Sequence, residues 1–241
     1  MKKTFSIGQA FAHAWNRFVG NWQVLGGVGL ILTAVNWLIK RPANPFIGPN
    51  MDPHAMAAVF AAMWPSMLAM VIAYAVYALV LLYAITNMGL IEGQGRKFSW
   101  GDTFPHGLGV YGRFVLFALL YVLIWAVFAV VIIFFLFIAG PAAPLFFLIG
   151  GLAYMFVIIK LQFATLAIVE GMGPIEAFKR SFKLTEECFW KTLGLVILVA
   201  VISIIGALTV IGTILTLPIS IIAVGKAYDV LKGHHHPAAQ A

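Results

Sequence analysis

The chain has 241 residues, of which 63% are hydrophobic and only 10% are charged, and its mean hydropathy is +1.01. A water-soluble domain of this size carries about a quarter charged residues, so the composition excludes a separate soluble catalytic domain, and we expect a single membrane domain over 1–241. No apolar stretch with a cleavage site follows Lys2 and Lys3, which argues against a secretory signal peptide.

Long apolar tracts predict an all-α integral membrane protein. They cover 22–39, 66–91, 114–139, 145–169 and 193–231, and a spanning helix needs about 20 residues. The last tract is too long for one crossing, because a helix rises about 1.5 Å per residue. We divide it near 206–212 and predict six transmembrane helices. The alternative is one long tilted helix over 193–231, which would place the C-terminus outside.

Proline residues indicate further breaks in these helices. Asp52 and Pro53 have the residue types of an N-cap and a first helical position, which predicts a short outer helix over 53–63. The run 141–144 begins and ends with proline and predicts a tight turn. Pro218 predicts a kink in the sixth span.

Lysine and arginine are distributed unequally between alternate loops. Twelve lie in the segments on the side of the N-terminus, and Lys40 and Arg41 lie on the other side. Cytoplasmic loops are enriched in basic residues, so we expect a bacterial inner-membrane protein with both termini in the cytoplasm. The net charge of +7 then faces anionic lipid. The basic residues are dispersed, which gives no support for binding nucleic acid.

Three cytoplasmic segments begin alike. Their caps are Ser6, Ser99 and Gly173; Gln9, Asp102 or Glu176 follows three residues later, and Phe11, Phe104 or Phe178 stands at the fifth helical position. This pattern resembles a capping box. The sequence Glu-Gly-x-Gly precedes the second and third segments, at 92–95 and 170–173. We predict three pseudo-repeats, 5–91, 98–170 and 173–232, each an interfacial amphipathic helix followed by a helical hairpin. Chance agreement of short motifs is the alternative.

Aromatic side chains lie on one face of these interfacial helices. Phe11 and Trp15 share a face of the first helix, with Gln9, His13, Asn16 and Arg17 on the other. Phe178 and Phe182 repeat this in the third helix, opposite Lys179, Arg180 and Lys183, and Phe104 stands in the shorter second. We expect the aromatic residues to lie at headgroup depth and the basic side chains to reach outward.

The third repeat resembles a known bacterial group. The residues are Glu170-Gly171, then Gly173-Pro-Ile-Glu-Ala-Phe-Lys-Arg-Ser-Phe-Lys-Leu-Thr185 and Phe189-Trp190, with 212–218 and Ala227-Tyr228. They are similar to multi-pass proteins that resemble the membrane domain of glycerophosphodiester phosphodiesterases. The segment 5–11 also fits, so the likeness covers most of the chain. It implies at most a role near lipids or a partner enzyme, because these residues do not contain the catalytic barrel.

Three ionisable side chains are candidates for binding a ligand or partner. Lys160 lies inside the fourth span, where a charge is costly; it could meet an anionic substrate or headgroup, or snorkel, or hydrogen-bond within the bundle. Glu92 and Glu170 hold equivalent repeat positions at inner ends of helices, where the helix dipole disfavours a carboxylate. They could bind a cation, cap the next helix, or pair with nearby basic residues such as Arg96 and Lys179.

No residue set reaches the level of a catalytic, cofactor or metal motif. Cys188 is the single cysteine, which excludes an intrachain disulfide and a multi-cysteine metal site; we interpret it as a small apolar side chain, with palmitoylation as the alternative. His234 to His236 lie in the tail 233–241, which we expect to be disordered and at most a weak, unselective metal binder. The glycines at 26–29 and 150–151 favour close helix packing.

These observations favour a non-catalytic membrane protein that organises or recruits partners or lipids at the inner membrane. Its expected partners are membrane lipids and a protein partner or second copy. The alternative is a transporter or channel for a small solute or lipid, which the repeat and Lys160 favour. The spans contain almost no acidic residues for ion coupling, which argues against it. An enzyme ranks third, because no converging acids, bases or metal ligands are evident.

Overall fold

The computed structural model describes residues 5–39, 75–104, 107, 109–139, 143–186 and 188–233. Within these ranges every regular element is helical, and five helices are long and apolar enough to cross a membrane. The chain is therefore an all-helical membrane protein. The predicted outer helix 53–63, the first two residues of the predicted turn 141–144 and the tail after Gly233 lie outside the described residues, and the turn's last two residues begin α5.

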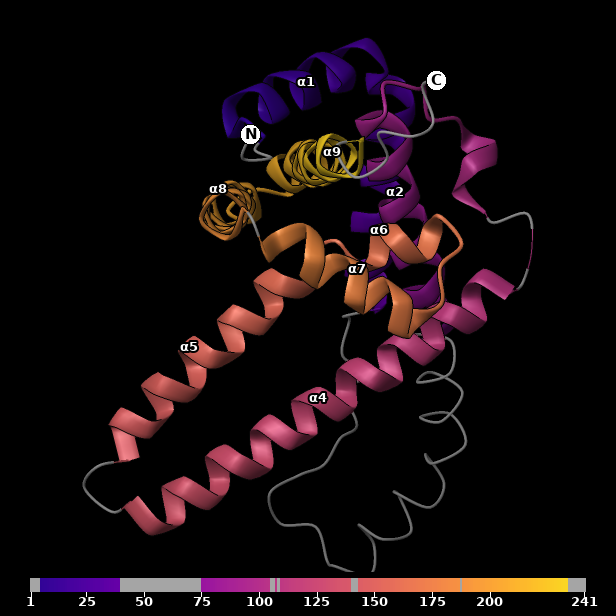
Figure 1. Cartoon of the computed structure of the whole chain (residues 1–241). Helices are drawn as coiled ribbons and strands as arrows, with labels where there is room; N and C mark the ends of the chain where they lie inside the picture. The colour runs from indigo at the N-terminus through magenta and orange to yellow at the C-terminus, as the bar shows by residue number, and fades with distance from the viewer. Residues whose placement is uncertain are drawn as a thin grey trace, which may run out of the picture.

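Figure 1 shows the arrangement of the helices. In chain order they are α1 Ile7–Gly20, α2 Trp22–Ile39, the helix Ala75–Gly93, the single 3-10 turn η1 Trp100–Thr103, α4 Gly109–Ala139, α5 Ala143–Leu161, α6 Ala164–Val169, α7 Pro174–Glu186, α8 Phe189–Ala207 and α9 Val210–Gly233. The first predicted span coincides with α2, whose apolar stretch Trp22–Ile31 is shorter than the five others.

The helix starts follow the predicted caps. The Ser6 side chain accepts a hydrogen bond from the backbone N–H of Gln9 at 3.4 Å, at the start of α1. The Asp102 carboxylate accepts the backbone N–H and the hydroxyl of Ser99, both at 2.8 Å, at the start of η1. The last helix of this kind, α7, begins at Pro174. Proline fits a first helical position because a backbone N–H there would have no partner within the helix, so its absence costs nothing.

The predicted division of the last apolar tract is confirmed. α8 ends at Ala207 and α9 begins at Val210, so the alternative of one long helix is wrong. The Thr209 side chain accepts the backbone N–H of Gly212 at 2.9 Å, which caps the second helix. A Cβ atom on Gly206 would lie 2.2 Å from Oγ1 of Thr216, so glycine lets the two helices turn tightly against each other. Pro218 lies inside α9.

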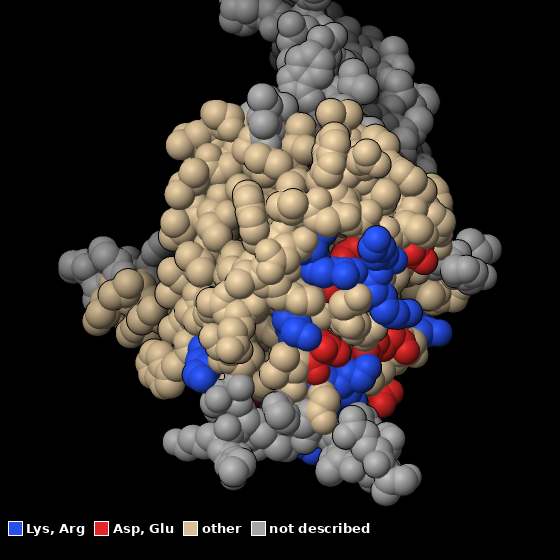
Figure 2. Space-filling model, turned by 90° about the horizontal axis from the view of Figure 1, so that it is seen from above, with Lys and Arg blue, Asp and Glu red and all other residues tan. Residues whose placement is uncertain are grey.

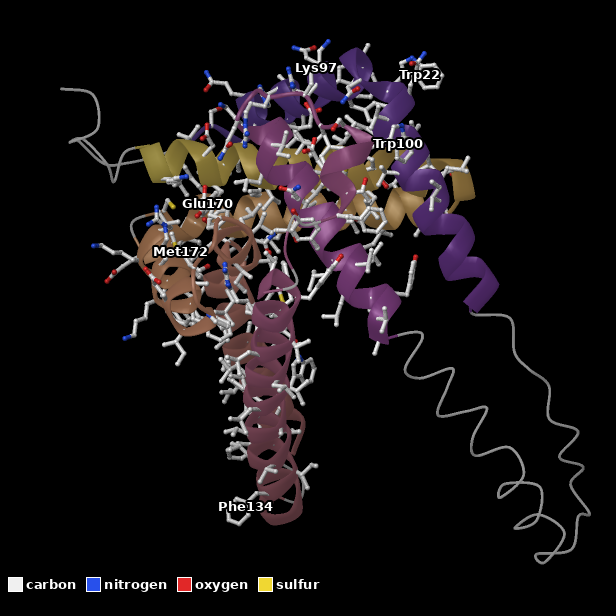
Figure 3. The ribbon with its side chains drawn as sticks, turned by 90° about the vertical axis from the view of Figure 1, so that its right-hand side faces the viewer. Trp22, Lys97, Trp100, Phe134, Glu170 and Met172 are labelled. Carbon is white, nitrogen blue, oxygen red and sulfur yellow. The ribbon has the colours of Figure 1, made fainter. Side chains whose placement is uncertain are left out.

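Two helical hairpins run in different directions. α4 and α5 project away from the rest of the chain, whereas α8 and α9 run side by side across that direction (Figures 1 and 3). α1 packs on α9, which also contacts α2 and α8. The buried part of the chain is therefore centred on α9, and buried residues such as Ile222, Ala223 and Tyr228 fill it. Most of α4 and α5 contributes exposed apolar side chains instead.

Glycines set the distance between α9 and the helix Ala75–Gly93. A Cβ atom on Gly225 would lie 1.8 Å from the carbonyl oxygen of Gly89. A Cβ atom on Gly93 would lie 2.4 Å from the carbonyl carbon of Gly225. The two backbones touch, and no side chain larger than hydrogen fits at the crossing. Small residues at such crossings allow close packing of helices in membranes.

Gly225→Ala is expected to lower the midpoint of thermal unfolding in detergent, because its methyl group would push two backbones apart at a cost of about 1 to 3 kcal/mol. The matched control is Gly151→Ala in α5, where an added Cβ meets no atom within 4 Å. That control should match or exceed the parent, since alanine favours helix more than glycine does. Equal midpoints for the two variants would contradict the close crossing.

Candidate functional site

The carboxylate of Glu92 is fully buried, with 0% of its side chain exposed. It accepts hydrogen bonds from Nε of Arg17 at 2.6 Å, from Nδ2 of Asn21 at 2.9 Å and from the backbone N–H of Phe98 at 2.7 Å. A buried charge is tolerated only when a counter-charge and further hydrogen bonds replace water. Glu92 therefore holds three parts of the chain together.

Two residues of the polar face of α1, His13 and Arg17, turn towards Glu92, whereas Gln9 and Asn16 on the same face are exposed. Nε2 of His13 lies 2.9 Å from the backbone carbonyl of Glu92, and Nδ2 of Asn21 also donates to the carbonyl of Phe98 at 2.9 Å. Arg17 makes a further hydrogen bond to the carbonyl of Arg96. We expected Arg17 to reach outward and Glu92 to pair with a basic neighbour. The partner instead comes from a helix distant in sequence.

Glu170 is paired in a similar way from another helix. Its carboxylate accepts a hydrogen bond from the hydroxyl of Tyr228 at 2.8 Å and forms an ion pair with Lys232. Glu170 is the residue that ends α6, where the dipole disfavours a negative charge. The cation and the hydroxyl from α9 offset this cost. The nearby Lys179 that the sequence offered as a partner stays exposed on α7.

The two glutamates do not occupy equivalent positions. Both helices end in a left-handed glycine, Gly95 with φ +81° and Gly171 with φ +105°. In each case the N–H of the next residue bonds five positions back, Arg96 to Ile91 at 3.0 Å and Met172 to Ala167 at 3.2 Å, as a Schellman turn requires. Glu92 lies three residues before its glycine and Glu170 directly before its own. The alignment of Glu92 with Glu170, which rested on the shared sequence Glu-Gly-x-Gly, therefore does not match the ends of the two helices.

Lys160 lies in the last turn of α5 and is half-buried. Its ammonium group stands 5.7 Å from the ring centre of Phe156 and 6.0 Å from that of Phe189, distances at which a cation is attracted to an aromatic face. Its backbone carbonyl accepts the hydroxyl of Ser181 at 2.6 Å. The contacts are those of a lysine held within the helix packing, and a ligand at Lys160 stays a prediction.

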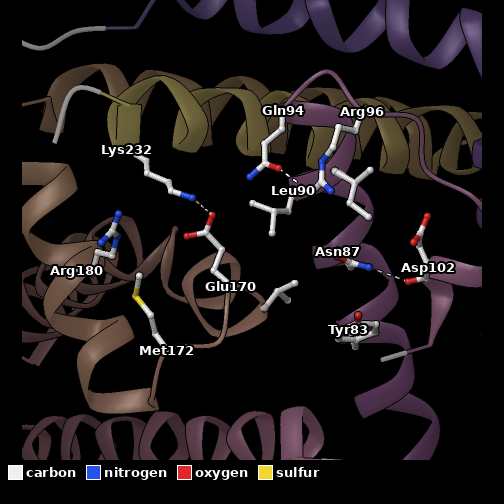
Figure 4. Close-up of a pocket in the computed structure, with 12 residues that line it drawn as sticks. Tyr83, Asn87, Leu90, Gln94, Arg96, Asp102, Glu170, Met172, Arg180 and Lys232 are labelled. Atoms are coloured by element: carbon white, nitrogen blue, oxygen red, sulfur yellow. Dashed lines mark hydrogen bonds and ion pairs between the residues drawn. The ribbon is translucent and has the colours of Figure 1, made fainter. Parts of the chain in front are cut away.

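A pocket of about 520 Å³ opens where α7, α9 and the helix Ala75–Gly93 meet (Figure 4). Three cations, Arg96, Arg180 and Lys232, and two carboxylates, Asp102 and Glu170, line it. Its remaining polar wall is Tyr83, Asn87 and Gln94, and its apolar wall is Leu90, Ile91, Val169 and Met172. Neither Glu92 nor Lys160 is among these lining residues. The three candidates from the sequence therefore do not converge on this pocket.

The five predicted interfacial aromatic residues divide into two groups. Trp15, Phe104 and Phe182 are exposed, by 56%, 61% and 41%. Phe11 and Phe178 pack against the buried core, and the rings of Phe178 and Phe117 are 5.1 Å apart. Contact of the exposed group with lipid headgroups stays a prediction.

Cys188 is buried, and its thiol donates to the carbonyl of Leu184 at 3.1 Å, which favours the interpretation as a small apolar side chain. Among the described residues no group of three histidine, cysteine, aspartate or glutamate side chains could hold a metal ion. The predicted histidine tail, His234 to His236, lies outside them.

Sequence reasoning missed the basic part of the pocket. Arg180 was assigned with Lys179 and Lys183 to an outward face of α7, yet it is partly buried and lines the pocket, while those two lysines are exposed. The position of Arg180 on α7 gave one usable signal, because the buried residues Ala177 and Leu184, three before and four after it, flank it on the helix surface. That the helix Ala75–Gly93 lines the same pocket has no local signal in the sequence.

The helices and their composition define an all-helical membrane protein. Residues 108–239, more than half of the chain, match the family described as "Domain of unknown function (DUF7847)", and the chain belongs to this family. No curated protein and no solved structure matches it. The resemblance to the membrane domain of glycerophosphodiester phosphodiesterases therefore stays a prediction.

Glu92→Gln is expected to destabilise the protein by about 3 kcal/mol, because it leaves a partly buried arginine without its counter-charge. The loss should be visible as a lower midpoint of thermal unfolding and as faster hydrogen exchange in α1. Glu186→Gln is the matched control, since Glu186 is exposed at the end of α7. If exchange in α1 were the same in both variants, Glu92 would not be holding that helix.

Proposed function

We propose that the chain is a non-catalytic, six-span protein of the bacterial inner membrane that organises lipids or recruits partners at the cytoplasmic surface. The observation that carries this proposal is the charged pocket between α7, α9 and the helix Ala75–Gly93. It joins charged groups to an apolar wall, which is the combination that a lipid headgroup region or an amphipathic partner presents.

The distribution of charge supports a cytoplasmic location of this pocket. In Figure 2 the charged side chains gather in one part of the face seen from above. Figure 3 places Lys97 and Trp22 at that end and Phe134 at the far end of α4. The sequence between Arg113 and Lys160 contains no charged residue. A basic end with exposed tryptophans and a long uncharged hairpin fits the positive-inside pattern.

The pairing of the carboxylates supports a non-catalytic function. Glu92 is occupied by Arg17 and Glu170 by Lys232. A catalytic acid or base needs reach to a substrate proton, and each of these groups is engaged by its own chain. We also propose that the three capped helices belong to a threefold pseudo-repeat and that the family is related to the phosphodiesterase membrane domains.

Transport of a small solute or lipid is the second candidate. Pro218 within α9 and the open pocket favour it, because interrupted helices often line transport sites. Lys160 lies outside that pocket, which removes the residue that first suggested transport.

The six-span topology predicts that the turn between α8 and α9 lies outside the cell. Leu208, which is 79% exposed in this turn, would be replaced by cysteine in a Cys188→Ser background. A membrane-impermeant maleimide should then label intact spheroplasts. Lys97→Cys, exposed at the basic end, is the matched control and should be labelled only after permeabilisation. Labelling of both positions only after permeabilisation would show that the α8–α9 hairpin does not cross the membrane.

The organising function predicts that the protein stays bound to another molecule after extraction from the membrane. Extracted in a mild detergent and weighed by native mass spectrometry, the chain should carry bound phospholipid, a second copy or another protein. An unrelated six-span inner-membrane protein prepared in parallel reports non-specific lipid carry-over. A bare monomer, or lipid no different from that of the parallel protein, would contradict the proposal.

A further inference from the structure

The two carboxylates in the pocket are already satisfied. Glu170 binds Lys232 and Tyr228, and Asp102 accepts two hydrogen bonds from Ser99. Arg96 donates to the neutral side-chain oxygen of Gln94 at 2.9 Å. The pocket therefore has one more positive than negative charge, and within the described residues neither Arg96 nor Arg180 forms an ion pair with a carboxylate.

Arg180 leaves one edge of its guanidinium group without an acceptor. Its Nε and Nη2 atoms are buried and have no acceptor at hydrogen-bond distance within the described chain. The guanidinium group as a whole is still close enough to the hydroxyl of Tyr228 to interact with it by charge and by hydrogen bonding. These two nitrogens form the side of an arginine fork that binds two oxygens of one phosphate or carboxylate. A buried donor without a partner is costly, so the site is incomplete without an acceptor.

The size and walls of the pocket narrow the choice of acceptor. A volume of about 520 Å³ is larger than one anion requires and has room for the group that carries it. The lining of the pocket also contains apolar side chains, among them Leu90 and Met172. Met172 lines the same pocket as Arg180 (Figure 4), and its flexible side chain can move to admit a ligand.

We propose that this pocket binds a phosphate group through the free edge of Arg180. Arg96 lies on the opposite side of the pocket (Figure 4) and adds positive charge there without contacting the same phosphate. The inference rests on the proposed function and specifies the chemistry of its ligand. The phosphate belongs to a phospholipid headgroup or to a soluble phosphate, and both sources present the same oxygens to Arg180.

The full chain in dodecyl maltoside would be titrated with dioleoyl phosphatidylglycerol in mixed micelles and, separately, with inorganic phosphate. Either ligand, when it binds the folded state, raises the midpoint of thermal unfolding. Arg180→Gln should weaken the response about tenfold, the loss expected when a charge-assisted hydrogen bond is removed. Arg96→Gln should weaken it less, because it removes a more distant charge. Lys179→Gln is the matched control, because it removes the same charge from an exposed position next to Arg180, and it should respond like the parent.

The probes separate the two sources. A response to phosphatidylglycerol alone assigns a lipid headgroup, and a response to inorganic phosphate assigns a soluble one. Equal stabilisation by dioleoylglycerol or by sodium chloride of the same ionic strength would overturn the proposal, as would parental binding by Arg180→Gln. Should Arg180→Gln fail to fold, Arg180→Lys carries the test, because it keeps the charge but removes the paired donors, and it should also bind less tightly than the parent. Partners that still co-purify when the phosphate response is absent would leave the proposed function standing.

Discussion

A carboxylate that loses water on folding must find donors within the chain, and Glu92 finds a counter-charge on α1, an amide on the residue that follows this helix, and the backbone N–H of Phe98. Because these donors come from before and after the glutamate, its burial fixes α1 over the end of the helix Ala75–Gly93 and fixes the turn that follows. Arg96 and Asp102 belong to that turn and to η1. The position of Arg96 in the pocket therefore depends on Glu92, which does not itself line the pocket.

The second constraint is steric and lies one turn earlier on the same helix. Gly89 and Gly225 bring two backbones into contact, so α9 passes closer to the helix Ala75–Gly93 than any side chain would allow. The end of α9 then reaches α6, where Lys232 and Tyr228 satisfy the carboxylate of Glu170. The Arg17–Glu92 ion pair and the contact of Gly89 with Gly225 thus act on the same group of helices. Hydrogen bonds need fixed distances, which a close backbone contact favours.

The remaining helices separate two surfaces with different chemistry. The α4–α5 hairpin presents apolar side chains along most of its length, as lipid requires. The opposite end carries the charges, the exposed tryptophans Trp15, Trp22 and Trp100, and the pocket. A protein built in this way has its polar chemistry at the membrane surface, which is where the phosphate of a lipid lies. The unsatisfied edge of Arg180 is the feature from which we propose a phosphate ligand at this end.

Local signals in the sequence determined the helical class, the helix starts after Ser6, Ser99 and Gly173, and the break between α8 and α9, because hydropathy, capping and glycine act within one turn of helix. The sequence also identified Glu92 and Glu170 as groups that need compensation, since the helix dipole is a local property. Only the tertiary structure decided which partners supply it. Arg17 and Lys232 are far away along the chain, and contacts between distant helices depend on how backbones cross, which no short pattern encodes. The role of Arg180 in the pocket was hidden for the same reason.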